Sequence, residues 1–370
     1  MAVLLLSSQS AASLVTYILA LAMLLRVSAW RDVFHCPMVW PVVALLIYLP
    51  LTTLWSTPFE PREVLTYGAR GLLIFCFVVA AAECQLRGEV QRGLGLALGV
   101  AAATLALLTI PLFYLYPPED GRLNGLGQLD THVVAGLVYG AALIMIAHAL
   151  LQRRTPLWTA VGLCCVALLA VAVWLTNSLN AWVSVLSGVL VLLAAHTLRR
   201  VGVFVAVIGA LACVAAIAAA TLVLQFVDDP ESVRRLLPRG DSFREVLWRV
   251  TLERVADAPW FGNGIATVDD VDIGHAILQH PHSMYLAVLF QGGVFGLVLF
   301  VWLILRTLRE LLKNYALGDA KLGLAILAVG LPSYLLDGHE LVDKISDTWF
   351  LFWLPVALAL GLRWHPGLRS

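Results

Sequence analysis

Long apolar runs, each about as long as a membrane-crossing helix, recur along this chain. A bilayer core of about 30 Å requires roughly 20 apolar residues in helical conformation. Stretches that meet this requirement lie near residues 8–28, 36–55, 64–83, 94–116, 132–151, 157–176, 181–198, 201–226, 284–305, 321–336 and 347–362. They do not alternate between apolar and polar residues, as the strands of a membrane β-barrel do. The pattern therefore predicts an all-α, polytopic transmembrane helix bundle of about eleven spans, within a range of about ten to twelve.

One connection between these spans differs from the others in length and polarity. Residues 227–283 form a polar stretch between the membrane helices of residues 1–226 and those of residues 284–370. Long connections inside a compact fold are usually functional. Ser242 to Glu245 fit a capping box, apolar residues then recur at helical spacing, and Pro259 marks the end of the expected helix. We expect a single integrated domain whose one large loop contains short helices.

Composition and charge place the chain in a membrane and orient it there. Hydrophobic residues make up 61% of the chain, charged residues only 13%, and the net charge is zero, so nucleic acid is not an expected partner. Short connections on one side of the predicted bundle carry 14 lysines and arginines, whereas those on the other side carry three, namely Arg62, Arg122 and Lys344. Basic connections face the cytoplasm. The charge pattern therefore predicts a cytoplasmic C-terminus and an outward-facing long loop.

Two histidines stand where the long loop meets the next predicted helix. The segment reads His280-Pro281-His282-Ser283, and Gly293 and Gly296 follow within the apolar run. Imidazole titrates near neutral pH, so a histidine at this boundary suits general base catalysis. A plain reading remains open, in which the polar residues cap a helix and the glycines allow close helix packing.

Several arginines of the outer side suit an anionic ligand. Guanidinium groups bind diphosphate oxygens in a bidentate manner and keep their charge. The long loop carries Arg234, Arg235, Arg239, Arg244, Arg249 and Arg254, and the Gly-rich loop 121–127 carries Arg122. Solvated arginines and an ordinary glycine turn are the alternative readings.

The same loop offers acidic residues with the spacing of some metal-dependent transferases. Asp270 and Asp272 form a D-x-D pattern beside Asp269. Exposed acids in loops are common, and the six cysteines form no C-x-x-C pair. We therefore expect neither a metal ion nor another cofactor.

Residues 282–296 resemble the signature of the bacterial O-antigen ligase and polymerase family of membrane glycosyltransferases. That signature is His, then Asn, Ser or Gln, nine residues, Gly, two residues and Gly, which here selects His282 rather than His280. Arg244, Trp248 and Pro259, followed by Gly262-Asn263-Gly264, are also similar to the family, as is the loop of Arg122. Many members carry a Ser-Arg pair where this chain reads Ser178-Leu179, so either another arginine takes that role or the role is lost.

The resemblance implies an enzyme of the bacterial inner membrane that works at the periplasmic face without metal or nucleotide. Its closest match in the family, O-antigen ligase, moves a glycan from undecaprenyl diphosphate to a sugar hydroxyl of lipid A–core, with inversion as the simplest route. It implies His282 and Arg244 as catalytic residues. Substrate-binding roles fall to Arg122, Trp248, Arg249 and His280. An arginine could stabilise charge on the leaving diphosphate, and histidine could take the acceptor's proton.

Other functions remain open at this point. An O-antigen polymerase or a protein O-oligosaccharyltransferase would use the same donor, and the histidine signature alone does not separate them from a ligase. A flippase for lipid-linked sugars or a solute transporter belongs to a different class. Transporters often show internal repeats and broken helices, and no such repeat is evident in this sequence.

Overall fold

The computed structural model describes residues 30–86, 95–127, 129–152, 155–209, 244–272, 277–278 and 280–364, with the single residues Ile18, Leu25 and Ala212. Its labelled helices are α3 (Trp30–His35), α4 (Val39–Leu51), η1 (Thr52–Trp55), α5 (Pro61–Leu86), α6 (Gly95–Leu115), α7 (His132–Gln152), α8 (Pro156–Leu175), α9 (Leu179–Thr197), α12 (Arg244–Asp257), α13 (Met284–Lys313), α14 (Gly318–Leu336), the π-helical turn η3 (Trp349–Trp353) and α15 (Leu354–Trp364). A helix also covers Arg200–Gly209. The two strands of the described part, β1 (Val271–Asp272) and β2 (Ile277–Leu278), have two residues each and pair antiparallel.

The helices agree with the predicted multi-pass membrane protein. Seven helices within the described residues are long and apolar enough to cross a membrane, and shorter apolar helices cover Val39–Trp55, Arg200–Gly209 and Trp349–Arg363. The predicted spans from 36–55 onward each coincide with a helix, although only the beginning of 201–226 is described. The predicted span 8–28 lies outside the described residues apart from Ile18 and Leu25.

Small residues allow the central helices to approach closely. An added Cβ at Gly136 would collide with Ala181 of α9, and one at Gly140 would collide with Val185. Such small residues are typical of helix contacts in membranes. Helix α14 is buried along most of its length and contacts α7, α9, α13 and α15, whereas α8 is largely exposed. The core of the bundle therefore lies around α14.

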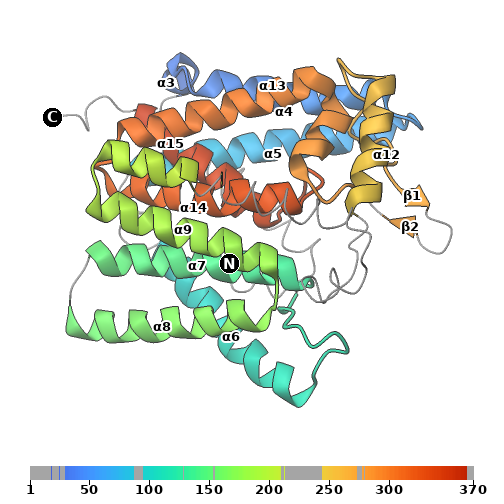
Figure 1. Ribbon diagram of the computed structural model, residues 1–370. Helices are drawn as coiled ribbons and strands as arrows, with labels where there is room; N and C mark the ends of the chain where they lie inside the picture. The colour runs from blue at the N-terminus through green and yellow to red at the C-terminus, as the bar shows by residue number, and fades with distance from the viewer. Residues whose placement is uncertain are drawn as a thin grey trace.

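The long helices lie side by side, and their connections alternate between the two ends of the bundle (Figure 1). One end carries α12, the two short strands, the α6–α7 connection and the start of α13. The opposite end carries the α7–α8 connection and the C-terminus. We call the first of these the α12 end. It gathers the segments in which the sequence placed its candidate chemistry.

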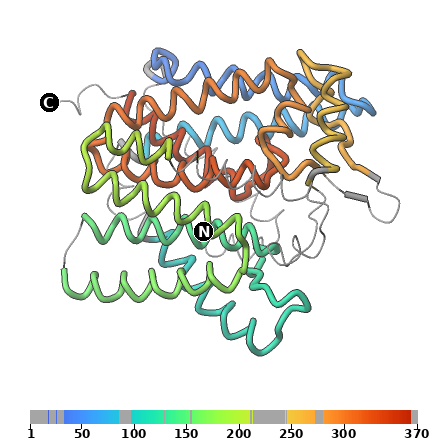
Figure 2. The backbone as a smooth tube through the Cα atoms, in the orientation of Figure 1, coloured from blue at the N-terminus to red at the C-terminus, as the bar shows by residue number. Residues whose placement is uncertain are grey.

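Helix α13 corrects the predicted span 284–305. Gly293 has the non-helical angles φ 62° and ψ −166°, which divide the helix into two parts at a kink. The part before Gly293 turns sharply away from the long part that follows (Figure 1, Figure 2). At 1.5 Å per residue, the 20 residues from 294 to 313 are about 30 Å long, enough to cross a bilayer by themselves. The straight helix that is long enough to cross a bilayer by itself therefore begins about ten residues later than the apolar pattern indicated.

Candidate functional site

His282 lies against a carboxylate at the α12 end of the bundle. Its Nδ1 is 3.2 Å from Oδ1 of Asp337, the residue that follows α14. The same Oδ1 accepts a 2.9 Å hydrogen bond from the Gly338 amide. The His282 side chain is 42% exposed and that of Asp337 is 27% exposed. A carboxylate at Nδ1 favours the tautomer whose Nε2 accepts protons, which is the form that a general base requires.

Arg244 joins this pair from the first turn of α12. Its Nη2 donates to the Leu336 carbonyl oxygen at 3.0 Å, one residue before Asp337. Burial lowers the pKa of Arg244, and the charge of Asp337 opposes that effect. Burial also acts to raise the pKa of Asp337. The hydrogen bonds from His282 and Gly338, together with the positive charges of His282 and Arg244, outweigh it and leave this pKa below its ordinary value. Asp337 is therefore a carboxylate at neutral pH.

Trp248 and His280 form the other side of the same cluster. Trp248 Nε1 donates to the Pro281 carbonyl oxygen at 2.9 Å, which ties α12 to the histidine segment. The ring of His280 stacks on that of His339 at 4.3 Å and meets the ring of His282 edge-on at the same distance. Burial, and then the neighbouring His339 and His282, lower the pKa of His280 to about 3. His280 is thus uncharged at physiological pH and lines one side of the site.

The remaining loop arginines of the prediction lie elsewhere. Arg249 follows Trp248 on α12, and its side chain is exposed. Arg254 donates to the Asp270 carbonyl oxygen at 2.9 Å. Residues 227–243, which include Arg234, Arg235, Arg239 and the predicted cap Ser242, lie outside the described residues. The predicted helix after that cap is confirmed as α12.

Arg122 lies in the α6–α7 connection, at the same end of the bundle as α12 (Figure 1). Its Nη1 donates to Nε2 of His132, the first residue of α7, at 2.9 Å. The amide of Leu123 donates to the Leu175 carbonyl oxygen at the end of α8. Leu175 is three residues before Ser178, where many family members begin their Ser-Arg pair. The fold thus links the loop of Arg122 to the end of α8, shortly before the position at which this sequence lacks that arginine.

The acidic side chains that the structure describes in the D-x-D segment do not converge on a common point at which they could hold a metal ion. Asp269 is partly buried, and burial raises its pKa. Asp272 belongs to the two-residue strand β1. Within the described residues, no group of three or more His, Cys, Asp or Glu side chains is arranged to hold a metal ion.

Arg70, a charged residue in the interior of α5, is paired with the α14–α15 connection. Its Nη1 lies 3.0 Å from Glu340 Oε2 and 3.6 Å from Asp343 Oδ1. The Tyr67 hydroxyl donates to Glu340 Oε1 at 2.9 Å, and the guanidinium carbon stands 4.8 Å from the centre of the Tyr67 ring. A charge at membrane depth is costly without such partners. This cluster holds the connection that carries Asp337 against α5.

The residues that sequence reasoning missed all belong to the connection 337–348. Its acids and histidine gather against the site or the Arg70 cluster, namely Asp337, His339, Glu340, Asp343 and Asp347. The available signal was composition, because four acids in a short connection between two membrane helices are unusual. Their partners come from distant parts of the chain, so no local pattern identifies them.

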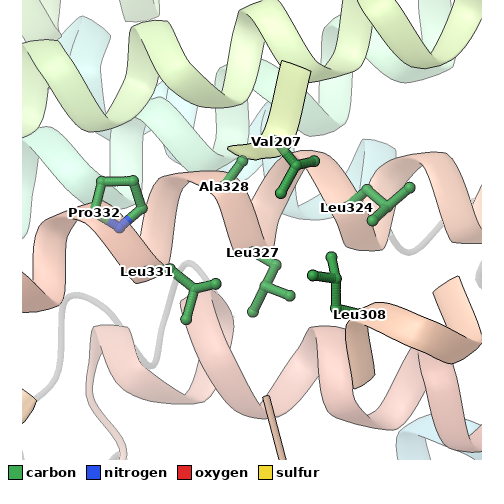
Figure 3. Close-up of a pocket in the computed structure, with 7 residues that line it drawn as sticks. All are labelled: Val207, Leu308, Leu324, Leu327, Ala328, Leu331 and Pro332. Atoms are coloured by element: carbon green, nitrogen blue, oxygen red, sulfur yellow. The ribbon is translucent and has the colours of Figure 1, made fainter. Parts of the chain in front are cut away.

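A cavity elsewhere in the bundle carries no chemistry. It lies between the helix Arg200–Gly209, α13 and α14, and Figure 3 shows its lining. All its lining residues are apolar, namely Val207, Leu308, Leu324, Leu327, Ala328, Leu331 and Pro332. It is a packing gap within the apolar core.

Comparison with known proteins agrees with this geometry. Residues 164–301 match the family model described as O-antigen ligase. That range contains Arg244, Trp248, His280 and His282, but not Arg122. An O-antigen ligase of Pseudomonas aeruginosa is 28% identical over 335 residues, which cover 90% of this chain and 79% of that protein. In both comparisons the chain is similar to O-antigen ligases.

The relationship confirms the resemblance drawn from residues 282–296 and supports a membrane glycosyltransferase. It agrees with the helical, multi-pass architecture. The cluster of Arg244, Trp248, His280, His282 and Asp337 lies at one end of this bundle, where the connections rather than the spans meet.

Proposed function

We propose that this protein is an O-antigen ligase. The donor is a glycan on undecaprenyl diphosphate, and the acceptor is a sugar hydroxyl of lipid A–core. The α12 end faces the periplasm of a bacterial inner membrane, so both lipid-linked substrates approach it from the outer leaflet. The contact that carries the proposal is the 3.2 Å pairing of His282 Nδ1 with Asp337, because it leaves Nε2 as a proton acceptor.

His282 takes the acceptor's proton in a single displacement. The acceptor oxygen attacks the anomeric carbon of the donor sugar while the bond from that carbon to the diphosphate oxygen breaks. The proton passes from the acceptor hydroxyl to His282 Nε2, and undecaprenyl diphosphate leaves with the bonding electrons. Asp337 orients the imidazole and stabilises the imidazolium that forms. One displacement inverts the anomeric configuration.

The arginines stabilise the leaving group, so the mechanism requires neither metal nor nucleotide. Arg244 lies within the electrostatic reach of the His282–Asp337 pair, and a guanidinium has five N–H donors to share between Leu336 and a diphosphate. Arg122 takes the role of the absent family arginine near Leu179. Trp248 fixes the histidine segment, Arg249 contacts the donor's outer charge, and the uncharged His280 lines one side of the site.

Transfer by purified protein in lipid A–core vesicles tests this proposal. His282→Ala should lower turnover by about 10²–10⁴-fold, the usual contribution of a general base, while His280→Ala should lower it much less. Donor binding measured separately distinguishes catalysis from recognition. Wild-type turnover in folded His282→Ala would refute the base. Transfer to a second lipid-linked unit instead of lipid A–core would identify a polymerase.

A further inference from the structure

The segment Pro259–Gly264, which follows α12, is joined to the kink of α13 through its backbone. The amides of Val294 and Phe295 donate to the carbonyl oxygens of Pro259 and Trp260 at 2.8 and 3.1 Å. In the opposite direction, the amides of Asn263 and Gly264 donate to the carbonyl oxygens of Phe290 and Gln291 at 2.8 and 3.0 Å. These four hydrogen bonds satisfy backbone groups at the break in α13. They also hold the segment Pro259–Gly264 against the point at which α13 turns into its long part.

Two glycines make this junction possible. A Cβ at Gly293 would collide with the Trp260 carbonyl group, and one at Gly262 would collide with the Gly293 amide nitrogen. Both glycines also have positive φ, 62° and 75°, which side chains disfavour. Asn263 Nδ2 donates to the Arg254 carbonyl oxygen at 3.1 Å, which ties the same segment to the last turn of α12.

Two aromatic side chains of this segment and one of α13 point out of the protein although the backbone here is fixed. Trp260 is 68% exposed, Phe261 60% and Phe295 52%. The Phe295 ring lies 6.3 Å from that of Phe261 and 5.1 Å from that of Tyr48. We call Trp260, Phe261 and Phe295 the aromatic rim. An aromatic side chain left in water forgoes part of the free energy that burial would give, so an exposed and fixed group of three indicates a non-aqueous neighbour.

The rim is continuous with an exposed apolar surface of α13. Below Phe295, the span of α13 exposes Val298, Val301, Trp302 and Leu305. Above it lies α12, a helix rich in charged residues. Aromatic side chains concentrate at the boundary between the hydrocarbon core and water. Continuity with this stripe on one side and a charged helix on the other therefore favours bilayer lipid as the rim's partner.

We propose that the aromatic rim is a bilayer-contact surface, embedded at the headgroup–acyl boundary of the outer leaflet. The rim fixes the depth of α12 through the Asn263–Arg254 hydrogen bond. That depth is the level at which a lipid diphosphate lies, a consequence that rests on the proposed function. The contact between the rim and lipid does not rest on the proposed function, so the experiment that tests it measures no enzymatic activity.

Fluorescence quenching in lipid nanodiscs tests the contact directly. Single cysteines replace Trp260, Asp257 or Trp302 in a chain whose six native cysteines are replaced, and each carries an environment-sensitive nitrobenzoxadiazole label. Asp257 is the matched control, because it is exposed and three residues earlier, and Trp302 is the control within the span. Phosphatidylcholine bearing a doxyl group near its headgroup or near its chain end, or aqueous iodide, serves as quencher.

The label at position 260 should be quenched more strongly by the shallow doxyl group than by the deep one, and only weakly by iodide. The order of the two doxyl groups should reverse at 302, and iodide should dominate at 257. Iodide quenching at 260 equal to that at 257 would overturn the proposal. Quenching at 260 that requires a spin-labelled polyprenyl diphosphate would assign the rim to the donor's tail and would equally overturn it. A Phe261→Cys label provides the second position.

Discussion

His280 and His282 are two residues apart and share the left-handed backbone conformation, with φ 48° and 47°. Their surroundings nevertheless give them different chemistry. His280 is enclosed by two other imidazoles, and its pKa falls to about 3. His282 instead lies beside the Asp337 carboxylate and is 42% exposed. Sequence spacing selects His282 through the family signature, but only the tertiary partner explains why that histidine suits proton transfer.

Replacing Asp337 with asparagine should impair chemistry more than binding. The amide would no longer compensate the charge of the protonated imidazole, so kcat should fall on the order of 10²-fold with KM little changed. Single-turnover and steady-state transfer assays measure the two effects. Asp343→Asn is the control, because Asp343 belongs to the same connection but contacts Arg70. An increase in KM alone would mean that Asp337 binds substrate instead.

At the scale of the element, α13 shows what the apolar pattern predicts and what it does not. The run from Met284 to Leu305 satisfies the length and hydropathy of a span, and a helix indeed forms there. The turn at Gly293 depends on hydrogen bonds that the amides of Val294 and Phe295 donate to the carbonyl oxygens of Pro259 and Trp260, which lie more than 30 residues earlier in the chain. A hydropathy window covers only residues that are neighbours in the sequence, so it does not contain these hydrogen-bond partners. Helix type was therefore predictable here, and helix direction was not.

Gly293→Ala should destabilise the protein by about 2 kcal/mol or more, because the new Cβ would meet the Trp260 carbonyl group at a backbone conformation that alanine disfavours. Gly68→Ala is the matched control, since nothing lies within 4 Å of its added Cβ. It should change stability by no more than about 0.5 kcal/mol. Thermal melting in detergent compares the two variants. Equal melting temperatures would show that the junction does not constrain α13.

Across the whole molecule, the connection 337–348 links the site to the core of the bundle. Its Glu340 contacts Arg70 and Tyr67 of α5, while Asp337 contacts His282 before α13. Hydropathy predicts the helices on either side, since each is a long apolar run. The pairings across 55 residues for Asp337 and 270 residues for Glu340 follow from the packing of the helices, which no local pattern specifies. The sequence therefore singled out the histidine and the arginine of this cluster, but not the carboxylate that the fold places beside them.

Glu340→Gln should stabilise the protein at alkaline pH and not at acid pH. Burial, followed by the charge of Asp343, raises the pKa of Glu340 to about 7. The folded state thus holds this proton more tightly than the unfolded chain, whose glutamate titrates near about 4.3. The resulting stabilisation is complete below that value and is lost as pH rises through about 7. Melting temperatures at pH ~5 and ~8 test this, with the exposed Glu119→Gln as control. A Glu340→Gln variant less stable than wild type at the higher pH would contradict it.

Orientation in the membrane can be measured at the two ends of the bundle. The basic connections predict that Glu119 faces the periplasm and Lys313 the cytoplasm. Single cysteines at these exposed positions, in a cysteine-free chain, should differ in labelling by a membrane-impermeant maleimide in spheroplasts. We expect labelling at 119 alone. Labelling at 313 alone would reverse the orientation and place the His282 site in the cytoplasm.

The helical segment between His282 and the kink at Gly293 determines where the imidazole lies relative to the kink. Nine residues, 284–292, connect Ser283 to Gly293, and all nine are helical. One added residue would rotate the imidazole by about 100° about the helix axis and displace it by about 1.5 Å. The imidazole would turn away from Asp337, while the kink would keep its backbone hydrogen bonds to Pro259 and Trp260. The number of residues in the signature thus sets both the distance and the angle between the kink and the His282 imidazole.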